Sequence, residues 1–512
     1  MADTVREIER KYEAGGDTGG AAGLPDLSGA APVARVADRG TVELDAVYYD
    51  TADHRLAAAG ITLRRRTGGS DAGWHVKLPV APGVRDEFRA PLSAGVPRPL
   101  AALVRSRTRR APLVPLIRLV SRRDVRHLFD EQGTLLAEAS TDEVTATRLT
   151  GGEGSTAWTE VEVELAQGGD PALLDALEPH LRAAGLRPSK APSKLVRALA
   201  ETGTHLPEPG DARRPSAKED AGRHVLAYVR EQVEAIAALD PGARRGTEDA
   251  VHQMRVATRR LRSAFRTFGK VLDRRVTDPL GQELKWLAGE LGVDRDREVL
   301  VERLRERLDE LPRPLVRGPV RARLRIWSGR RRIETRRRLT AVLDGERYLA
   351  LLDGLDALLA DPPLRPAAAR PPAPVLAKAV LSDYARLAAR VEHALATDPG
   401  TGRDTALHDA RKAAKRVRYA AEAAAPALGK PAKKFAREMK AVQSLLGDHQ
   451  DSLMARTALG TIAAQAALAG ESAFTFGLLY GREERQAERD ERELPQVWAR
   501  ASQERWRDGL AG

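Results

Sequence analysis

The segment Thr159–Leu165 reads TEVEVEL and decides how the first part of the chain is interpreted. Successive side chains of a β-strand point to opposite faces of the sheet. One face of this strand therefore carries Glu160, Glu162 and Glu164. The other face carries Val161, Val163 and Leu165, which need burial, for instance against the helix predicted over 171–185. A strand with one wholly apolar and one wholly acidic face predicts a polar compartment on its acidic side.

Two further charged strands strengthen that interpretation. The segment Glu7–Lys11 reads EIERK and places Glu7, Glu9 and Lys11 on one face, while TLRRR places Arg64 and Arg66 together. Solvated faces with cross-strand ion pairs are the alternative for any one strand. Three such strands in one domain favour a closed barrel that gathers them into a channel. Clustered carboxylates need a cation there, and Mg²⁺ or Mn²⁺ binds carboxylate oxygens and phosphates together.

Short β-like runs separated by Gly, Pro and Asp continue to about residue 200, and a polar, Pro-bearing linker follows. Long Ala/Leu/Arg/Glu-rich segments with helical spacing make up the rest. We therefore expect an α+β multidomain chain, with a β domain at 1–202, a linker at 203–217 and an all-α domain at 218–508. The Pro-rich stretch 361–374 is expected to split the helical domain into two halves.

The N-terminal domain resembles the CYTH family, the triphosphate tunnel metalloenzymes. The resemblance starts at the ExExK signature in EIERK and continues through YYDTADHRLAAAGITLRRR, WHVKLP, SRRDVRHLFD, TEVEVEL and SKAPSKLVRAL. It implies an eight-stranded antiparallel β-barrel tunnel and metal-dependent attack on a triphosphate-containing substrate.

The same resemblance implies roles for individual residues. The implied metal ligands are Glu7, Glu9, Asp142, Glu160, Glu162 and Glu164. The implied triphosphate clamp consists of Lys11, Arg64, Arg66, Lys77, Arg123 and Lys194. Catalysis is expected to depend most on Glu9, Lys11 and Glu162. Arg122 and Arg126 replace Arg123 if the strand register shifts by one residue, and Arg65 and Arg89 are weaker candidates.

A helical unit occurs twice in the second domain. Val251–Phe265 reads VHQMRVATRRLRSAF and Leu407–Ala421 reads LHDARKAAKRVRYAA. The segments LKWLAGELGVDRD (284–296) and MKAVQSLLGDHQD (439–451) match in outline downstream, with an offset that differs by one residue. A duplication accounts for both matches most simply.

Each copy carries a basic stripe at helical spacing. The stripes hold His252, Arg255, Arg259 and Arg262 in the first copy and His408, Arg411, Lys415 and Arg418 in the second. Like charges repel along a helix face, so the stripes favour a polyanionic partner over a face neutralised by neighbouring acids. The two histidines are also weaker metal-ligand candidates. An apolar stripe including Met254, Leu261 and Phe265 is expected to face the core.

These helices resemble the CHAD domain, a helical module that commonly follows a CYTH domain. The resemblance implies binding of inorganic polyphosphate by both stripes, with Lys285 and Lys440 as possible neighbours on the same surface.

Bulk composition limits the other functions. The 512 residues include 84 Lys+Arg against 72 Asp+Glu, so the net charge is +12 and polyanionic partners are favoured. Aromatic residues make up 4%, which disfavours single-stranded nucleic acid, and the absence of cysteine excludes thiolate chemistry. Without an apolar leader or a spanning segment, a cytoplasmic protein without membrane attachment is expected, at polyphosphate granules if the helical domain binds them.

The expected activity is metal-dependent hydrolysis of inorganic triphosphate. Adenylate cyclase or thiamine-triphosphatase activity can be built on the same barrel, so fold alone does not separate them. A non-enzymatic polyphosphate-binding scaffold is the remaining alternative.

Overall fold

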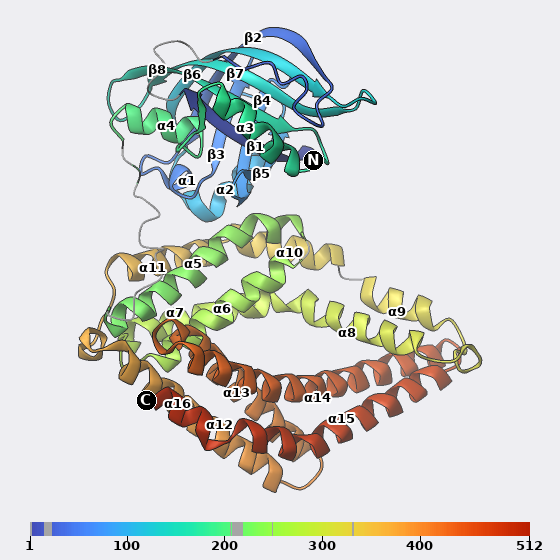
Figure 1. Ribbon diagram of the computed structural model, residues 1–512. Coiled ribbons are helices and arrows are strands. Elements are labelled where there is room, and N and C mark those ends of the chain that lie inside the picture. The colour runs from blue at the N-terminus through green and yellow to red at the C-terminus, as the bar shows by residue number, and fades with distance from the viewer. Residues whose placement is uncertain are drawn as a thin grey trace. The chain divides into compact units, whose positions relative to one another are not determined.

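The computed structural model describes residues 3–14, 23–204, 206, 219–247, 249–329 and 332–511. The chain separates into two compact units, Met1–Gly210 and Asp211–Gly512 (Figure 1). Most of the predicted linker 203–217 lies outside the described residues. Across the described part of the chain, none of the helices combines the length and apolarity that crossing a bilayer takes.

The first unit is a closed antiparallel barrel, as predicted. Its strands are β1 (Asp3–Ala14), β2 (Arg35–Asp50), β3 (Thr62–Thr67), β4 (Gly73–Ala81), β5 (Val84–Ala90), β6 (Val114–Phe129), β7 (Leu135–Arg148) and β8 (Ser155–Leu165). They pair in the order β5-β4-β3-β2-β6-β7-β8-β1, and pairing of β1 with β5 closes the ring. A short ninth strand, β9 (Leu186–Pro188), pairs with the end of β1.

Helices cover parts of the barrel. They are α1 (Arg55–Ala58), α2 (Arg98–Thr108), α3 (Ala172–Ala183) and α4 (Lys194–Glu201). The apolar face of β8 packs against α3, since Val161 and Val163 are buried in one cluster with Leu177 and Leu181. This contact is the one that the alternation in TEVEVEL predicted, and it leaves the acidic face of β8 on the inside of the barrel.

The second unit is all-helical. It contains α5 (Ala221–Arg245), α6 (Ala250–Thr267), α7 (Arg274–Glu290), α8 (Gly292–Asp309), α9 (Val320–Gly329), α10 (Arg332–Asp344), α11 (Glu346–Ala360), α12 (Pro372–Ala396), α13 (Thr401–Leu428), α14 (Lys430–Leu468), α15 (Phe474–Ala501) and α16 (Glu504–Ala511). Short 3₁₀ turns lie at Arg313–Leu315 and Pro366–Ala369. The Pro-rich stretch 361–374 connects α11 to α12.

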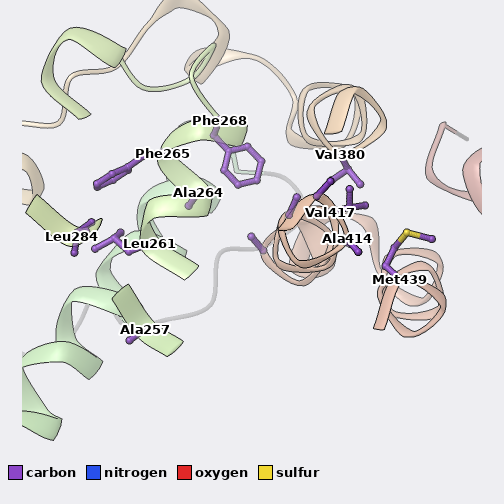
Figure 2. Close-up of a cluster of buried hydrophobic side chains, with 14 of the residues drawn as sticks. Ala257, Leu261, Ala264, Phe265, Phe268, Leu284, Val380, Ala414, Val417 and Met439 are labelled. Carbon is purple, nitrogen blue, oxygen red and sulfur yellow. The ribbon is translucent and has the colours of Figure 1, made fainter. Parts of the chain in front are cut away.

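The two repeat signatures lie on α6 and α13, which pack in the same hydrophobic core. Figure 2 shows Leu261 and Phe265 of α6 and Val417 of α13 among its buried side chains. Met254, Leu261 and Phe265 are fully buried, as the apolar stripe predicted. The polar sides of α6 and α13 therefore point away from this core.

The downstream halves of the repeats differ. In the first copy the helix is interrupted at Leu291, between α7 and α8, whereas the second copy forms one continuous 39-residue helix, α14. The one-residue difference in offset arises upstream of this break, between the α6 and α7 matches, because Lys285/Lys440 and Gly292/Gly447 keep the same offset on its two sides.

Candidate functional site: a charged tunnel and a basic helical face

The barrel encloses a cavity of about 650 Å³, which we call the tunnel. Its lining includes four of the predicted metal-binding carboxylates on β1 and β8 and the whole predicted phosphate clamp. These are Glu7, Glu9, Lys11, Arg64, Arg66, Lys77, Arg123, Glu162, Glu164 and Lys194. Arg123 is the inward residue of its strand, while Arg122 is exposed beside Glu143. Asp142 and Glu160 lie behind this lining, where Lys194 contacts both.

Lys194 is the centre of the acidic wall. Its Nζ lies 2.9 Å from Asp142, 2.5 Å from Glu160 and 2.6 Å from Glu162. Lys194 is the first residue of α4, whose N-terminus Ser193 caps by accepting the Val196 N–H. Leu195, Ala198 and Leu199 of α4 are buried against the barrel, which fixes the lysine at its inner position.

Two more cations reach the same carboxylates. Arg123 donates two 2.7 Å hydrogen bonds to Asp142 and one to Glu162. Lys11 contacts Glu162 and lies 3.1 Å from Glu9. Although burial opposes it, Asp142 and Glu162 raise the pKa of Lys194 well above its ordinary value. Burial likewise opposes ionisation of Glu162, but Lys11, Lys194 and Arg123 hold its pKa well below the usual range.

The three carboxylates on this wall suit a hard divalent cation. Asp142, Glu160 and Glu162 offer oxygen atoms that all lie within 4.8 Å of one another. Oxygen-only donors of this kind are the ligands that Mg²⁺ and Mn²⁺ prefer. The residues present therefore fit a metal ion of this class, provided that the cations now contacting them move to other partners.

A second acidic group lies further along β1 and β8. Glu9 is the register partner of Glu164, and Lys77 contacts Glu7 at 2.7 Å. Burial and the neighbouring Glu7 raise the pKa of Glu164 to about 7. The predicted metal ligands thus form two neighbouring groups on the same pair of strands.

The opposite wall is basic but has a buried carboxylate at its centre that the sequence interpretation missed. Glu87 is fully buried, and it lies 3.7 Å from Arg64 and 3.9 Å from Lys77. His75, left without a role from sequence, lies 2.8 Å from Glu87 through Nδ1 and 2.8 Å from the Asp71 carbonyl oxygen through Nε2. The alternation of Arg85, Glu87 and Arg89 in VRDEFRA is the signal that could have revealed this residue.

Arg66, at the edge of the same wall, contacts Asp71 in the turn between β3 and β4. The turn is held close to β2, because a Cβ on Gly68 would lie 2.2 Å from the Glu43 carbonyl oxygen and its φ is +80°. The clamp residues are therefore oriented by carboxylates built into the barrel.

In the helical unit, the two predicted stripes meet. Burial, together with Arg411, Arg259 and Arg255, lowers the pKa of Lys415 to about 7. Arg411 lies 3.6 Å from Asp451. These residues come from α6, α13 and α14, and we call the surface of the two stripes the basic helical face.

The repeats build this face in the same way. The guanidinium of Arg255 lies against Gly292, and that of Arg411 lies against Gly447. Each arginine is thus placed over the glycine of its own repeat's downstream segment. Lys285 and Lys440 are exposed.

Another polar cluster joins Asp404, His449 and Glu491 across α13, α14 and α15. Arg403 contacts Glu491 at 3.1 Å, and Asp404 lies near enough to Arg456 to favour the charged form of that guanidinium group. Guanidinium groups therefore already balance these carboxylates, so the cluster is a salt-bridge network between helices. His252 and His408 are not part of any metal-ligand group among the described residues.

A barrel lined by interleaved acids and bases is thus followed by an all-helical unit with a duplicated basic face. Comparison with known proteins agrees. The CYTH domain model matches residues 6–198 and the CHAD domain model matches residues 227–460. The chain belongs to the family of proteins that join a CYTH domain, of the triphosphate tunnel metalloenzyme type, to a CHAD domain.

Three proteins are similar to all or part of this chain. An uncharacterized protein of Mycobacterium tuberculosis strain H37Rv is 40% identical over 507 residues, covering 95% of this chain and 94% of that protein. The CHAD domain structure from the plant Ricinus communis is 24% identical, covers 57% of this chain and 94% of that one, and has a TM-score of 0.46. A Hippeastrum adenylyl cyclase candidate, described with a dominant triphosphatase activity, is 20% identical, covers 39% and 98%, and has a TM-score of 0.22.

Proposed function

We propose that the barrel hydrolyses inorganic triphosphate with the help of Mg²⁺ or Mn²⁺. The observation that carries this proposal is the division of the tunnel into an acidic wall and a basic wall. Carboxylates on β1, β7 and β8 suit a divalent cation, and Arg64, Arg66 and Lys77 face the same cavity. A small, highly charged phosphate chain with a metal ion complements both walls.

The small number of aromatic rings in the described lining supports an inorganic substrate over a nucleotide or thiamine triphosphate. Among the described lining residues, Tyr48 and His127 carry rings, and the Tyr48 hydroxyl accepts a hydrogen bond from Arg64 at 3.3 Å. A base or thiazole ring gains from apolar or aromatic surface, and Val42, Leu44 and Val125 of the same lining provide apolar surface. Cyclase or thiamine-triphosphatase activity on this barrel remains the second candidate.

The metal would be held by Glu7, Glu9, Asp142, Glu160, Glu162 and Glu164, the carboxylates of the two acidic groups. When bound, it would neutralise phosphate charge and lower the pKa of a water molecule. Lys11, Arg123 and Lys194 then exchange carboxylate partners for phosphoryl oxygens, and Arg64, Arg66 and Lys77 orient the chain from the opposite wall. The enclosing barrel limits water around these contacts, which strengthens them.

The test is phosphate release from tripolyphosphate, ATP, thiamine triphosphate and long polyphosphate, each with Mg²⁺ and Mn²⁺. We expect tripolyphosphate to be preferred, and we expect Glu9→Ala and Lys11→Ala to reduce turnover by at least about 100-fold. Arg10→Ala is the matched control, because Arg10 lies on the other strand face beside Glu178. Full activity in Glu9→Ala and Lys11→Ala would remove the tunnel as the site, and cyclic AMP from ATP would favour the cyclase.

We further propose that the basic helical face binds inorganic polyphosphate through His252, Arg255, Arg259, Arg262, His408, Arg411, Lys415 and Arg418. The support is the mutual proximity of like charges from two repeats, which a polyanion would relieve. Such binding weakens steeply with salt. Arg411→Ala with Lys415→Met is expected to lower polyphosphate affinity at least about tenfold without changing tripolyphosphate turnover. Unchanged affinity would refute this role. A protein that binds polyphosphate in this way is expected in the cytoplasm, at polyphosphate granules.

A further inference from the structure

A second basic cluster lies where α6, α12 and α13 meet. It consists of Arg266 on α6, Arg386 and Arg390 on α12, and Arg416 on α13, and we call it the α12 cluster. Its anchor is Asp383, a buried residue of α12 that is 1% exposed. Thr267 donates a 2.6 Å hydrogen bond to Asp383 and ties the end of α6 to α12.

The carboxylate of Asp383 serves two of the four arginines directly. Arg386 lies 2.8 Å from it and Arg416 lies 3.3 Å from it. Burial lowers the pKa of Arg416, and Arg390, Arg386 and Arg266 lower it further against the opposing effect of Asp383. Lys412 and, more weakly, Arg390 lower the pKa of Asp409 of α13, so the described part of this junction holds four arginines against the carboxylates of Asp383 and Asp409.

The α12 cluster adjoins the basic helical face along α13. With about 100° per residue, Lys412 lies between Lys415 and Arg416 on the helix circumference. The exposed Lys412 contacts Asp409 at 2.9 Å. The solvent-facing side of α13 is thus basic from the Lys415 edge to the Arg416 edge, with this one acid paired locally.

Continuity also runs along α6. Arg266 follows Arg262 by one helical turn, and both line a cavity of about 310 Å³ together with Arg274 of α7. Nearby charge from Arg266 and, above all, burial lower the pKa of Arg262. A flexible chain of phosphates that occupies the basic helical face therefore meets more guanidinium groups on either route off that face.

We propose that the α12 cluster is an additional subsite for phosphoryl groups and makes the helical unit selective for long polyphosphate chains. Chains that are only long enough to occupy the basic helical face do not contact the α12 cluster and gain no affinity from it. Longer chains reach both surfaces and gain the effective concentration of a second, linked contact. This inference rests on the proposed polyphosphate binding and assigns it a length dependence.

The experiment compares the full-length wild type with Arg386→Ala/Arg390→Ala, using a short oligophosphate and a long polyphosphate as labelled probes. We expect affinity for the long chain to fall about tenfold and affinity for the short one to change less than twofold. The matched control is Arg275→Ala/Arg347→Ala, which removes the same charge from exposed sites paired with Asp273 and Glu283. It should leave both affinities within about twofold.

A second variant pair guards against a folding defect. Arg386→Gln/Arg390→Gln keeps a donor for Asp383 and should give the same length-selective loss with an unchanged melting temperature. Equal losses for both chain lengths, or a long-chain loss no larger than in the control, would overturn the inference. If only the α12 variants leave affinity unchanged, the α12 cluster is refuted and polyphosphate binding by the basic helical face stands. Unchanged affinity in Arg411→Ala with Lys415→Met refutes that binding itself.

Discussion

The tunnel and the basic helical face use the same cationic side chains in opposite electrostatic settings. In the tunnel, Lys194 contacts three carboxylates, and its pKa is raised. On the helical face, Lys415 lies among Arg411, Arg259 and Arg255, and burial with these neighbours lowers its pKa to about 7. The positive charge of Lys194 is stabilised by neighbouring carboxylates, whereas that of Lys415 is destabilised by burial and neighbouring arginines.

The difference teaches what each surface can accept. A ligand of the tunnel must replace existing carboxylate contacts, so it needs both negative charge for the cations and a metal ion for the released acids. A ligand of the helical face would replace contacts such as those of Arg411 with Asp451 and of Arg418 with Glu422, and it needs only negative charge. These two settings fit the ligands proposed above, a small metal–phosphate complex for the tunnel and a long polyanion for the helical face.

The largest expected effect comes from removing the central tunnel cation. Lys194→Met leaves Asp142, Glu160 and Glu162 with less compensation in a buried wall, and we expect unfolding free energy to fall by about 3–5 kcal/mol. Urea unfolding measures it. The exposed Lys190 provides the control, because Lys190→Met should change stability by less than about 0.5 kcal/mol. Equal stability of both variants would show that the wall does not depend on its lysine.

A smaller effect is expected at the basic wall. Glu87→Gln removes the buried carboxylate between Arg64 and Lys77 and makes this wall resemble the helical face. We expect a loss of about 2 kcal/mol in stability, part of which tripolyphosphate restores by supplying new negative charge. Thermal melting with and without tripolyphosphate should show a larger ligand-induced shift in the variant. A shift equal to that of the wild type would contradict this reading of the wall.

The third prediction concerns pH. Polyphosphate favours the charged form of Lys415, so binding takes up a proton above about pH 7 and affinity falls as pH rises, by at most about tenfold per unit. Asp451 opposes the effect of the arginines on the pKa of Lys415, and burial together with Lys412 lowers the pKa of the neighbouring His408. Lys415→Arg should flatten the profile between pH 7 and 8.5. The same slope in both proteins would rule out Lys415 as its source.

The smallest effect separates the two repeats. A Cβ on Gly292 would lie 2.9 Å from the Arg255 guanidinium carbon, whereas one on Gly447 would have 3.5 Å to the Arg411 guanidinium. Gly292→Ala should therefore displace Arg255 and weaken polyphosphate binding about twofold to threefold, while Gly447→Ala leaves it unchanged. Titrations of both variants at one salt concentration test this, and equal affinities would show that the repeats tolerate a methyl group alike.

Much of this architecture could be predicted from strand alternation and repeats. The faces of EIERK, TLRRR and TEVEVEL were assigned correctly because each strand keeps a strict two-residue period. Glu87 was missed because its partners Arg64 and Lys77 lie on β3 and β4, and only the pairing of β3 with β4 and of β4 with β5 brings them to it. The α12 cluster was missed because α12 carries no repeat signature, and only packing against α6 and α13 brings its arginines together.

Closure of the ring through β1 also has a consequence for biosynthesis. The strand made first pairs with β5 and β8, and β8 ends at Leu165. At about 5–20 residues per second, the ribosome needs roughly 10–30 s to produce the last of these partners. During that interval the nascent chain has no finished hollow to sequester metal or phosphate. The proposed binding of metal and phosphate in the tunnel can therefore begin only after β1 has paired with β5 and β8.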